Sequence, residues 1–452
     1  MFKDKKRNID IIISIALFIF VSAFWVFTYN HAINVTPRYH KQLEPVRNLG
    51  WGEIWTWTNY GHYSRYSPIG MLAIGLLDRD YLAPALGIDP MSNAFENAGR
   101  LIPLYYLLFS CISILTFYLC RSLSLHTLPS LIAALYLGVN DGFSYFFYYV
   151  DTLAVCLLLI FGICVIYFWI KYLNKQKPLF LVLYYIFFLL SIGSWDQWIN
   201  LLLCIILFSI FLLFRKKANK KRIIIHGLII PLILFLVYLL LRLPAILNET
   251  GRTAEAQYVF SYPSKRLMIE DMVSNISHHI AGSIDALFFP WPMISQAVIN
   301  KIDINQYNQY NLFSPYADMH YRAFTEWYVG LLFGVFMCGL GWIIYYFKEK
   351  TETHEIILLS ILLIFIGFLA HLPVMFRIYF DLPGYVGLLN YKDSLTVLGV
   401  SILVGFLVNH FLKIKNSKLL IILAIILNFW IVNNNYQKIF INFIFKRGIY
   451  PW

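Results

Sequence analysis

The sequence has few charged residues. Only 13% of its 452 residues are Asp, Glu, Lys or Arg, and 60% are apolar, whereas about 25% of residues are charged in an ordinary soluble domain. A soluble chain of this length has no way to bury so much apolar surface, because its surface still grows with its size. Bilayer hydrocarbon accommodates that surface. The composition therefore excludes an ordinary soluble protein and predicts an integral membrane protein.

Motifs of soluble nucleotide-binding and hydrolytic enzymes are also missing. The chain has no P-loop, no Gly-x-Gly-x-x-Gly fingerprint and no Gly-x-Ser-x-Gly elbow. Its long apolar runs, such as 201–214, do not alternate with polar residues as the strands of a transmembrane barrel do. Because a spanning segment must satisfy its own backbone hydrogen bonds, we expect these runs to be helices.

Apolar runs close to the length that crosses about 30 Å of hydrocarbon recur along the chain. They predict an all-α polytopic membrane protein with about eleven transmembrane helices. Two runs, 178–194 and 198–214, are short, which indicates tilted spans or a hairpin that turns at Trp195–Trp198. The predicted spans are 11–30, 101–120, 128–149, 152–171, 178–194, 198–214, 223–242, 326–347, 355–376, 394–412 and 418–434.

Lysine and arginine gather in short segments between these runs. When the spans are numbered in order, every such cluster falls on one side, and the positive-inside rule makes that side the cytoplasm. The same pattern explains most of the formal net charge of +12 without a nucleic-acid partner. We expect a multi-pass plasma (inner) membrane protein with a cytoplasmic N-terminus and an outer C-terminus. The clusters lie at 3–7, 171–177, 215–222, 348–350 and 413–418.

The six cysteines all lie inside predicted spans. None lies in an outer segment, where an oxidising compartment would favour disulfides. We therefore interpret them as buried packing residues. They are Cys111, Cys120, Cys156, Cys164, Cys204 and Cys338.

Two outer segments, 31–100 and 243–325, are too long to be simple turns, and loops of this length are usually functional. They divide the chain into an N-terminal transmembrane module (1–242) that carries the first loop, an outer loop with surface helices (243–325), and a C-terminal transmembrane module (326–452). Within the first loop, the apolar stretch Ile69–Leu77 is too short to span and is expected at the membrane interface.

Ionisable residues occur at the predicted outer ends of several spans. They are interpreted either as helix caps and interface residues, or as the lining of an outer cavity that binds an anionic lipid head group and a polar acceptor. Arginine suits phosphate because its planar fork donates two hydrogen bonds at once. A metal site at His278 and His279 is not favoured, because no third ligand stands at a helical spacing. The residues at the span ends are Asp151, Asp196, Arg242, Arg377, Asp381, Lys392 and Asp393.

Short motifs in three outer regions share an order with one enzyme family. The first loop carries Glu44, Glu53, the stretch Ile54–Trp57 and a Gly-His…Arg-Tyr-Ser-Pro run at 61–68; a hairpin carries Trp-Asp-Gln at 195–197; a late turn reads Arg-Ile-Tyr…Pro at 377–383. This order resembles the GT-C class of polytopic membrane glycosyltransferases, which take a sugar from a polyprenyl-phosphate carrier on the outer leaflet. The adjacent acidic pair typical of that first loop is absent here.

The resemblance implies a GT-C-like fold and a hexosyltransferase that modifies a cell-envelope glycan, lipid or protein, as the enzymes that modify O-antigen, teichoic acid or lipid A do. It also implies site residues. Glu44, Glu53 and Asp196 are the candidate catalytic carboxylates, and no metal or other cofactor is favoured, although some relatives use a divalent metal. Candidate groups for binding lipid phosphate and substrate are Arg38, His62, Arg65, Arg377, Tyr379 and Lys392.

Two other functions remain open from the sequence. A lipid-linked oligosaccharide polymerase would carry an arginine-rich outer loop, and Arg252, Arg266 and Arg322 lie in 243–325. A transporter or flippase of lipid-linked sugars would usually show internal repeats, which we do not find.

Overall fold

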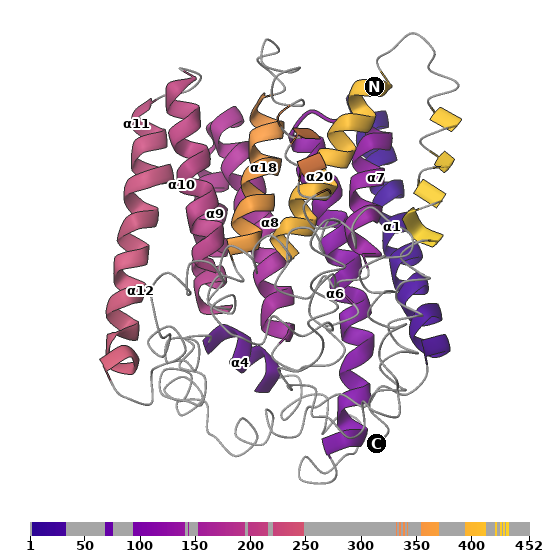
Figure 1. The fold of residues 1–452 in the computed structure, drawn as a ribbon, viewed down its shortest axis with the longest axis horizontal. Coiled ribbons are helices and arrows are strands. Elements are labelled where there is room, and N and C mark those ends of the chain that lie inside the picture. The colour runs from indigo at the N-terminus through magenta and orange to yellow at the C-terminus, as the bar shows by residue number, and fades with distance from the viewer. Residues whose placement is uncertain are drawn as a thin grey trace.

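The computed structural model describes residues 2–32, 68–75, 94–140, 143, 152–194, 198–215, 220–247, 354–369 and 394–412, with separate helical residues between 331 and 341 and between 421 and 433. Within these ranges every regular element is a helix, as predicted (Figure 1). Five stretches are long and apolar enough to cross a membrane: Asn8–Thr28, Leu104–Ser122, Leu153–Lys175, Lys220–Leu240 and Ser394–Phe411. The described helices are therefore those of a membrane protein by length and composition.

The predicted boundaries agree closely with several helices. Helices α9 (Pro178–Ser194) and α10 (Trp198–Phe214) have the predicted bounds, and each has 17 residues. Helices α8 (Thr152–Lys175), α18 (His354–Leu369) and α20 (Ser394–Phe411) also begin within one residue of the predicted start. The runs 326–347 and 418–434 lie largely outside the described residues, so the count of eleven stays a prediction.

Two long helices extend beyond their predicted spans. Helix α1 covers Phe2–Ala32, and α6 covers Ala94–Ser122, so α6 begins seven residues before the run predicted from 101. The first outer segment therefore ends at about residue 93 rather than 100. Most of its length, 33–67 and 76–93, lies outside the described residues.

The predicted span 128–149 is not one continuous helix, and residues 144–149 lie outside the described residues. Helix α7 covers only Thr127–Gly138, which is 12 residues and about 18 Å at 1.5 Å per residue. After it, the Asn140 N–H donates to the Leu137 carbonyl at 3.2 Å, and the Phe143 N–H donates to the Asn140 carbonyl at 3.1 Å. The helix ends early because Asn, Asp and Gly at 140–142 favour a turn over a helix. The mean hydropathy of 128–149 does not reveal this preference.

The predicted span 223–242 is helical but not uniform. It begins with α11 (Lys220–Arg222), continues as a π-helix, η3 (Ile223–Ile229), and ends as α12 (Ile230–Leu247). Pro231 accounts for the wide turn, since in a regular α-helix its ring would clash with the carbonyl four residues earlier and it has no N–H to donate to it. The loosened turn also lets Gly227 approach α10 closely: a Cβ there would lie only 2.4 Å from Ser209 Oγ.

The helices differ in how much of their surface lies inside the bundle. In the candidate span of α1 22% of the residues are buried, as in that of α11 to α12, whereas 78% are buried in α20. Figure 1 shows α1 and α12 at the two flanks of the bundle. Large apolar side chains such as Ile12 (65% exposed) and Leu240 (67% exposed) point outward there, as expected of surfaces that meet hydrocarbon.

Hydrogen bonds from side chains to backbone carbonyls join the buried helices. Ser113 Oγ of α6 donates to the Ala134 carbonyl of α7 at 2.8 Å, and Trp25 Nε1 of α1 donates to the Gly138 carbonyl at 2.8 Å. Gly138 itself has no room for a side chain, because a Cβ would lie 2.8 Å from Ser113 Oγ. Close approach at small residues and interhelical hydrogen bonds are the usual means of packing helices in a membrane.

The interpretation of the cysteines as buried packing residues is confirmed for four of them. Cys120, Cys156, Cys164 and Cys204 are buried, but Cys111 and Cys338 are exposed, and all six are free thiols. The exposed pair lies on helices with partly outward-facing surfaces, where a small apolar side chain needs no burial.

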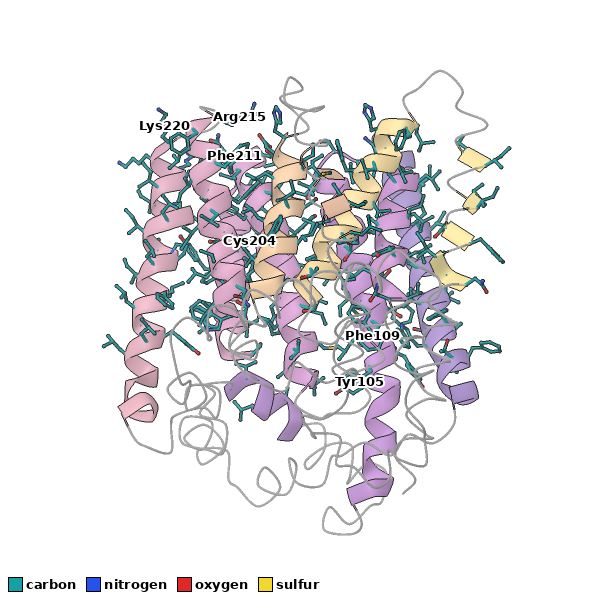
Figure 2. The ribbon with its side chains drawn as sticks, viewed as in Figure 1. Tyr105, Phe109, Cys204, Phe211, Arg215 and Lys220 are labelled. Atoms are coloured by element: carbon teal, nitrogen blue, oxygen red, sulfur yellow. The ribbon has the colours of Figure 1, made fainter. Side chains whose placement is uncertain are left out.

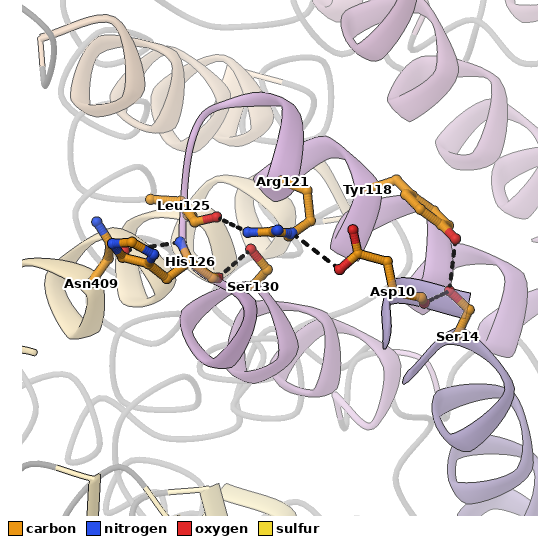
Figure 3. Close-up of polar contacts among 8 residues, drawn as sticks. All are labelled: Asp10, Ser14, Tyr118, Arg121, Leu125, His126, Ser130 and Asn409. Carbon is orange, nitrogen blue, oxygen red and sulfur yellow. Dashed lines mark hydrogen bonds and ion pairs between the residues drawn. The ribbon is translucent and has the colours of Figure 1, made fainter. Parts of the chain in front are cut away.

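Contacts between distant parts of the chain gather at one end of the bundle. Arg121, at the end of α6, forms an ion pair of 3.5 Å with Asp10 of α1, and its Nη1 donates to the Leu125 carbonyl at 2.6 Å. Nearby, the His126 N–H at the start of α7 donates to Asn409 Oδ1 of α20 at 3.0 Å. Figure 3 shows these contacts as two sets of interactions, which meet at the neighbouring residues Leu125 and His126.

Two further contacts lie at the same end. Arg222 donates from Nη1 to Gln176 Oε1 in the turn between α8 and α9, and Arg215 after α10 pairs with His354 at the start of α18. Arg215 and Lys220 are labelled at the top of Figure 2. We call this end of the bundle the basic end, because the described basic residues of the clusters 171–177 and 215–222 lie there: Lys171, Lys175, Lys177, Arg215, Lys220, Lys221 and Arg222.

Candidate functional site

The short helix α4 (Pro68–Gly75) docks on the bundle at the end opposite the basic end (Figure 1). Pro68 is its first residue, a position that proline favours because the first helical N–H has no partner in any case. The sequence Pro-Ile-Gly-Met-Leu-Ala-Ile-Gly is apolar throughout. Residues 69–75 of the apolar stretch that was predicted at Ile69–Leu77 as too short to span are thus helical, and they pack on α8 and α9.

Glycine makes this docking close. A Cβ added to Gly70 would lie 2.5 Å from Ala154 Cβ of α8 and 2.7 Å from the Ser194 carbonyl oxygen of α9. In return, a Cβ added to Gly193 would lie 2.6 Å from Ile69 Cδ1. Gly70 therefore meets the backbone of both α8 and α9 and cannot be enlarged without moving α4, whereas Gly193 leaves room for the Ile69 side chain.

Three segments that carry predicted site residues adjoin the helix ends that meet at the docked α4. The motif at 61–68 ends at Pro68, where α4 begins. Asp196 follows Ser194 by two residues, and Asp151 directly precedes α8. Hence the first loop, the hairpin between α9 and α10, and the turn before α8 all leave the bundle around α4.

The predicted site residues themselves lie outside the described residues, so their roles stay predictions. Lys392 stands two residues before α20, whose start points away from the basic end. Arg242 is described only as part of α12. The residues outside the described ranges are Arg38, Glu44, Glu53, His62, Arg65, Asp151, Asp196, His278, His279, Arg377, Tyr379, Asp381, Lys392 and Asp393.

Sequence reasoning missed one polar cluster within the spans. Tyr185 Oη of α9 lies 2.5 Å from His226 Nδ1 of η3, and Tyr184 Oη donates to the His226 carbonyl at 3.2 Å. The Tyr172 ring meets the imidazole edge to face. The signal was present, since a histidine inside an apolar run is rare and usually faces the bundle interior. The cluster joins α8, α9 and η3 just below the basic end.

The described residues contain no group of three or more His, Cys, Asp or Glu that could hold a metal ion. No protein-family model matches the chain, and no curated protein matches it in a comparison of sequences. The functional assignment therefore rests on the order of the loop motifs and on the helix contacts that position them.

Proposed function

We propose that this protein is a membrane glycosyltransferase that moves a sugar from a polyprenyl-phosphate carrier to a cell-envelope glycan, lipid or protein on the outer face. The observation that carries the proposal is the docking of α4. The first-loop motif ends at Pro68, where α4 begins. Gly70 of α4 lies against the backbone of Ser194 in α9, and Ser194 precedes Asp196 by two residues. Two motifs separated by more than 100 residues in the chain thereby leave the bundle side by side.

The chemistry requires a base and a means of stabilising the leaving group. A carboxylate, Glu44, Glu53 or Asp196, takes the proton from an acceptor hydroxyl as its oxygen attacks the anomeric carbon. The bond from that carbon to the phosphate oxygen breaks, and its electron pair leaves with the lipid phosphate. Arg65, Arg377 or Lys392 beside the phosphate would stabilise the charge that develops on it.

Sugar transfer tests the proposal directly. A panel of radiolabelled polyprenyl-phosphate sugars would be supplied to membranes that contain the wild-type protein. Separate membranes that contain Glu44→Gln, Glu53→Gln or Asp196→Asn would receive the same panel. Glu355→Gln is the matched control, because it removes an acid from the first turn of α18 at the basic end. We expect transfer by wild type and the control, and a loss of about 100-fold or more in the variant that lacks the base.

Other outcomes separate the alternatives. Transfer that survives all three substitutions would keep the enzyme class and reject the assigned bases. Joining of intact lipid-linked oligosaccharides, without transfer of single sugars, would identify a polymerase instead. Movement of the labelled lipid between leaflets without any new glycosidic bond would identify a flippase.

A further inference from the structure

The basic end carries a surface patch that the proposed glycosyl transfer does not use. The patch is made by the turn between α8 and α9 and by the start of the helix that leads into η3. Lys175, Lys177, Lys220 and Lys221 are exposed, and Arg222 is half-buried. Because Arg222 donates a hydrogen bond to Gln176, the two turns are held together as one surface rather than as two independent charged loops.

Gln176 occupies a backbone conformation that favours glycine. Its φ is 54°, and it follows the last residue of α8, the position where helices most often end on a left-handed glycine. Its N–H still donates to the Tyr172 carbonyl at 2.8 Å and so closes the helix. A side chain is retained at this unfavourable position, and that side chain supplies the acceptor for Arg222.

The two turns that make the patch contain no acidic residue of their own. Asp196 is the one acid between 152 and 242 in the sequence, and it follows the end of α9 that lies opposite the patch. Other acids of the described helices stand at the basic end: Asp4 and Asp10 lie on α1, where Asp10 is paired with Arg121, and Glu355 stands on α18 beside the Arg215–His354 contact. The two turns therefore present cations without an acid among them, which suits the binding of an anion.

Exposed apolar side chains lie next to these cations on the same elements. Leu179 (63% exposed) and Val182 (53%) follow Lys177 on α9, and Ile224 (40%) follows Arg222 on η3. Phe214, which is 82% exposed, is the last residue of α10 and precedes Lys220 by six residues in the sequence. A free phosphate ion would meet only the cations, whereas a phospholipid offers a phosphate to the cations and acyl chains to the apolar side chains below.

We propose that the patch formed by Lys175, Gln176, Lys177, Lys220, Lys221 and Arg222 binds the phosphate head group of an anionic phospholipid from the adjacent leaflet. Cations near a membrane surface attract anionic lipid, and arginine donates two parallel hydrogen bonds to phosphate oxygens. Lys175 and Lys177 face the phosphate from one turn and Arg222 from the other. The Arg222–Gln176 bond fixes the spacing between them.

The test uses the full chain in nanodiscs of phosphatidylcholine with increasing phosphatidylglycerol, and counts retained lipid by native mass spectrometry. The variant Lys175→Gln/Arg222→Gln removes one cation from each turn. The matched control, Lys3→Gln/Lys5→Gln, removes two cations from the start of α1 at the same end. At about fivefold per cation, we expect binding of phosphatidylglycerol to weaken about 30-fold in the variant and little in the control.

Three results would overturn the proposal. An equal loss of phosphatidylglycerol binding in the control and the variant would make the attraction a general effect of net charge. Equal retention of phosphatidylcholine by the wild type would leave the cations with a role in membrane orientation alone. Displacement of the lipid by inorganic phosphate at millimolar concentration would make the phosphate ion the ligand. If the double variant fails to fold, Lys175→Gln, which alters an exposed side chain alone, serves in its place.

Discussion

Replacement of Gly70 by alanine tests how α4 is held on the bundle. The added methyl group would start 2.5 Å from Ala154 Cβ and 2.7 Å from the Ser194 carbonyl oxygen. Neither neighbour can rotate away, since one is a Cβ fixed to its helix and the other is backbone. Helix α4 must therefore move outward by roughly 1 Å or more to restore ordinary van der Waals separation, which is about 3.5–4.0 Å between carbon atoms.

The expected cost follows from the class of substitution. Overpacking by a methyl group in a close contact costs about 1–3 kcal/mol. Because α4 contacts the bundle at the ends of α8 and α9, this cost should appear as weaker docking of α4 rather than as unfolding of the whole bundle. A cost of about 2 kcal/mol lowers the docked population relative to the undocked one by roughly 30-fold.

A disulfide can report that population. A Cβ at Gly193 would lie 3.3 Å from Ile69 Cβ, close to the spacing of about 3.5–4.5 Å found in disulfides. In the Ile69→Cys/Gly193→Cys protein we expect rapid oxidation, and a clearly slower rate after Gly70→Ala is added. Gly162→Ala is the matched control, because its Cβ would meet the nearest atom, Leu201 Cδ2, at an ordinary 3.5 Å.

Oxidation at the same rate with and without Gly70→Ala would refute the close docking of α4. If the docking also positions the first loop, Gly70→Ala should reduce sugar transfer while the thermal unfolding midpoint in detergent stays near that of Gly162→Ala. Adding Ala154→Gly removes the shorter of the two clashes and should restore part of both signals. A large fall in the unfolding midpoint alongside the fall in transfer rate would instead mean that α4 supports the whole fold.

Three further substitutions test the seams between helices, each by the thermal unfolding midpoint in detergent. Trp25→Phe removes the donor to the buried carbonyl at the end of α7 and should cost about 1–3 kcal/mol, because that carbonyl loses its indole donor. Asn409→Ala removes the acceptor for the N–H at the start of α7 and should cost about 1 kcal/mol, whereas Asn409→Asp retains an acceptor and should cost less. Arg121→Gln should destabilise more than Arg121→Gln combined with Asp10→Asn, because the single variant leaves a carboxylate without its partner. Equal midpoints of these two variants would show that the unpaired carboxylate carries no penalty.

The sequence predicts helix positions well where apolar runs are bounded by polar residues. Helix α9 starts at Pro178 directly after Lys177 and ends before Trp195-Asp196-Gln197, so its bounds follow from hydropathy alone. The early end of α7 does not follow from hydropathy. The segment 138–142 reads Gly-Val-Asn-Asp-Gly and is too short to interrupt the apolar run, so the helix ends there because Asn, Asp and Gly favour a turn. The π-helix η3 was foreseeable from Pro231, which lies inside an apolar run.

The candidate site was accessible from sequence only as a set of motifs. The acids and cations of the loops are visible in the chain, and so is the short apolar run before residue 77. What no one-dimensional pattern contains is that Gly70 and Gly193 bring α4 into contact with α8 and α9. That juxtaposition depends on the packing of three elements, and the glycines have no charge or periodicity that would mark them.

The two ends of the bundle carry different chemistry, and this difference bears on where a phosphate-linked donor binds. Most cations of the described residues lie at the basic end, yet the loop motifs leave from the α4 end. Under the proposed function, a lipid phosphate that reacts near α4 would be neutralised by loop cations such as Arg65, because Lys175 and Arg222 lie a helix length away, about 25 Å for the 17 residues of α9. The two proposals together give the protein two separate requirements for anionic lipid, one at each end of the bundle. Substitutions in the patch should alter lipid retention without altering the chemical step, and substitutions in the loops should do the reverse.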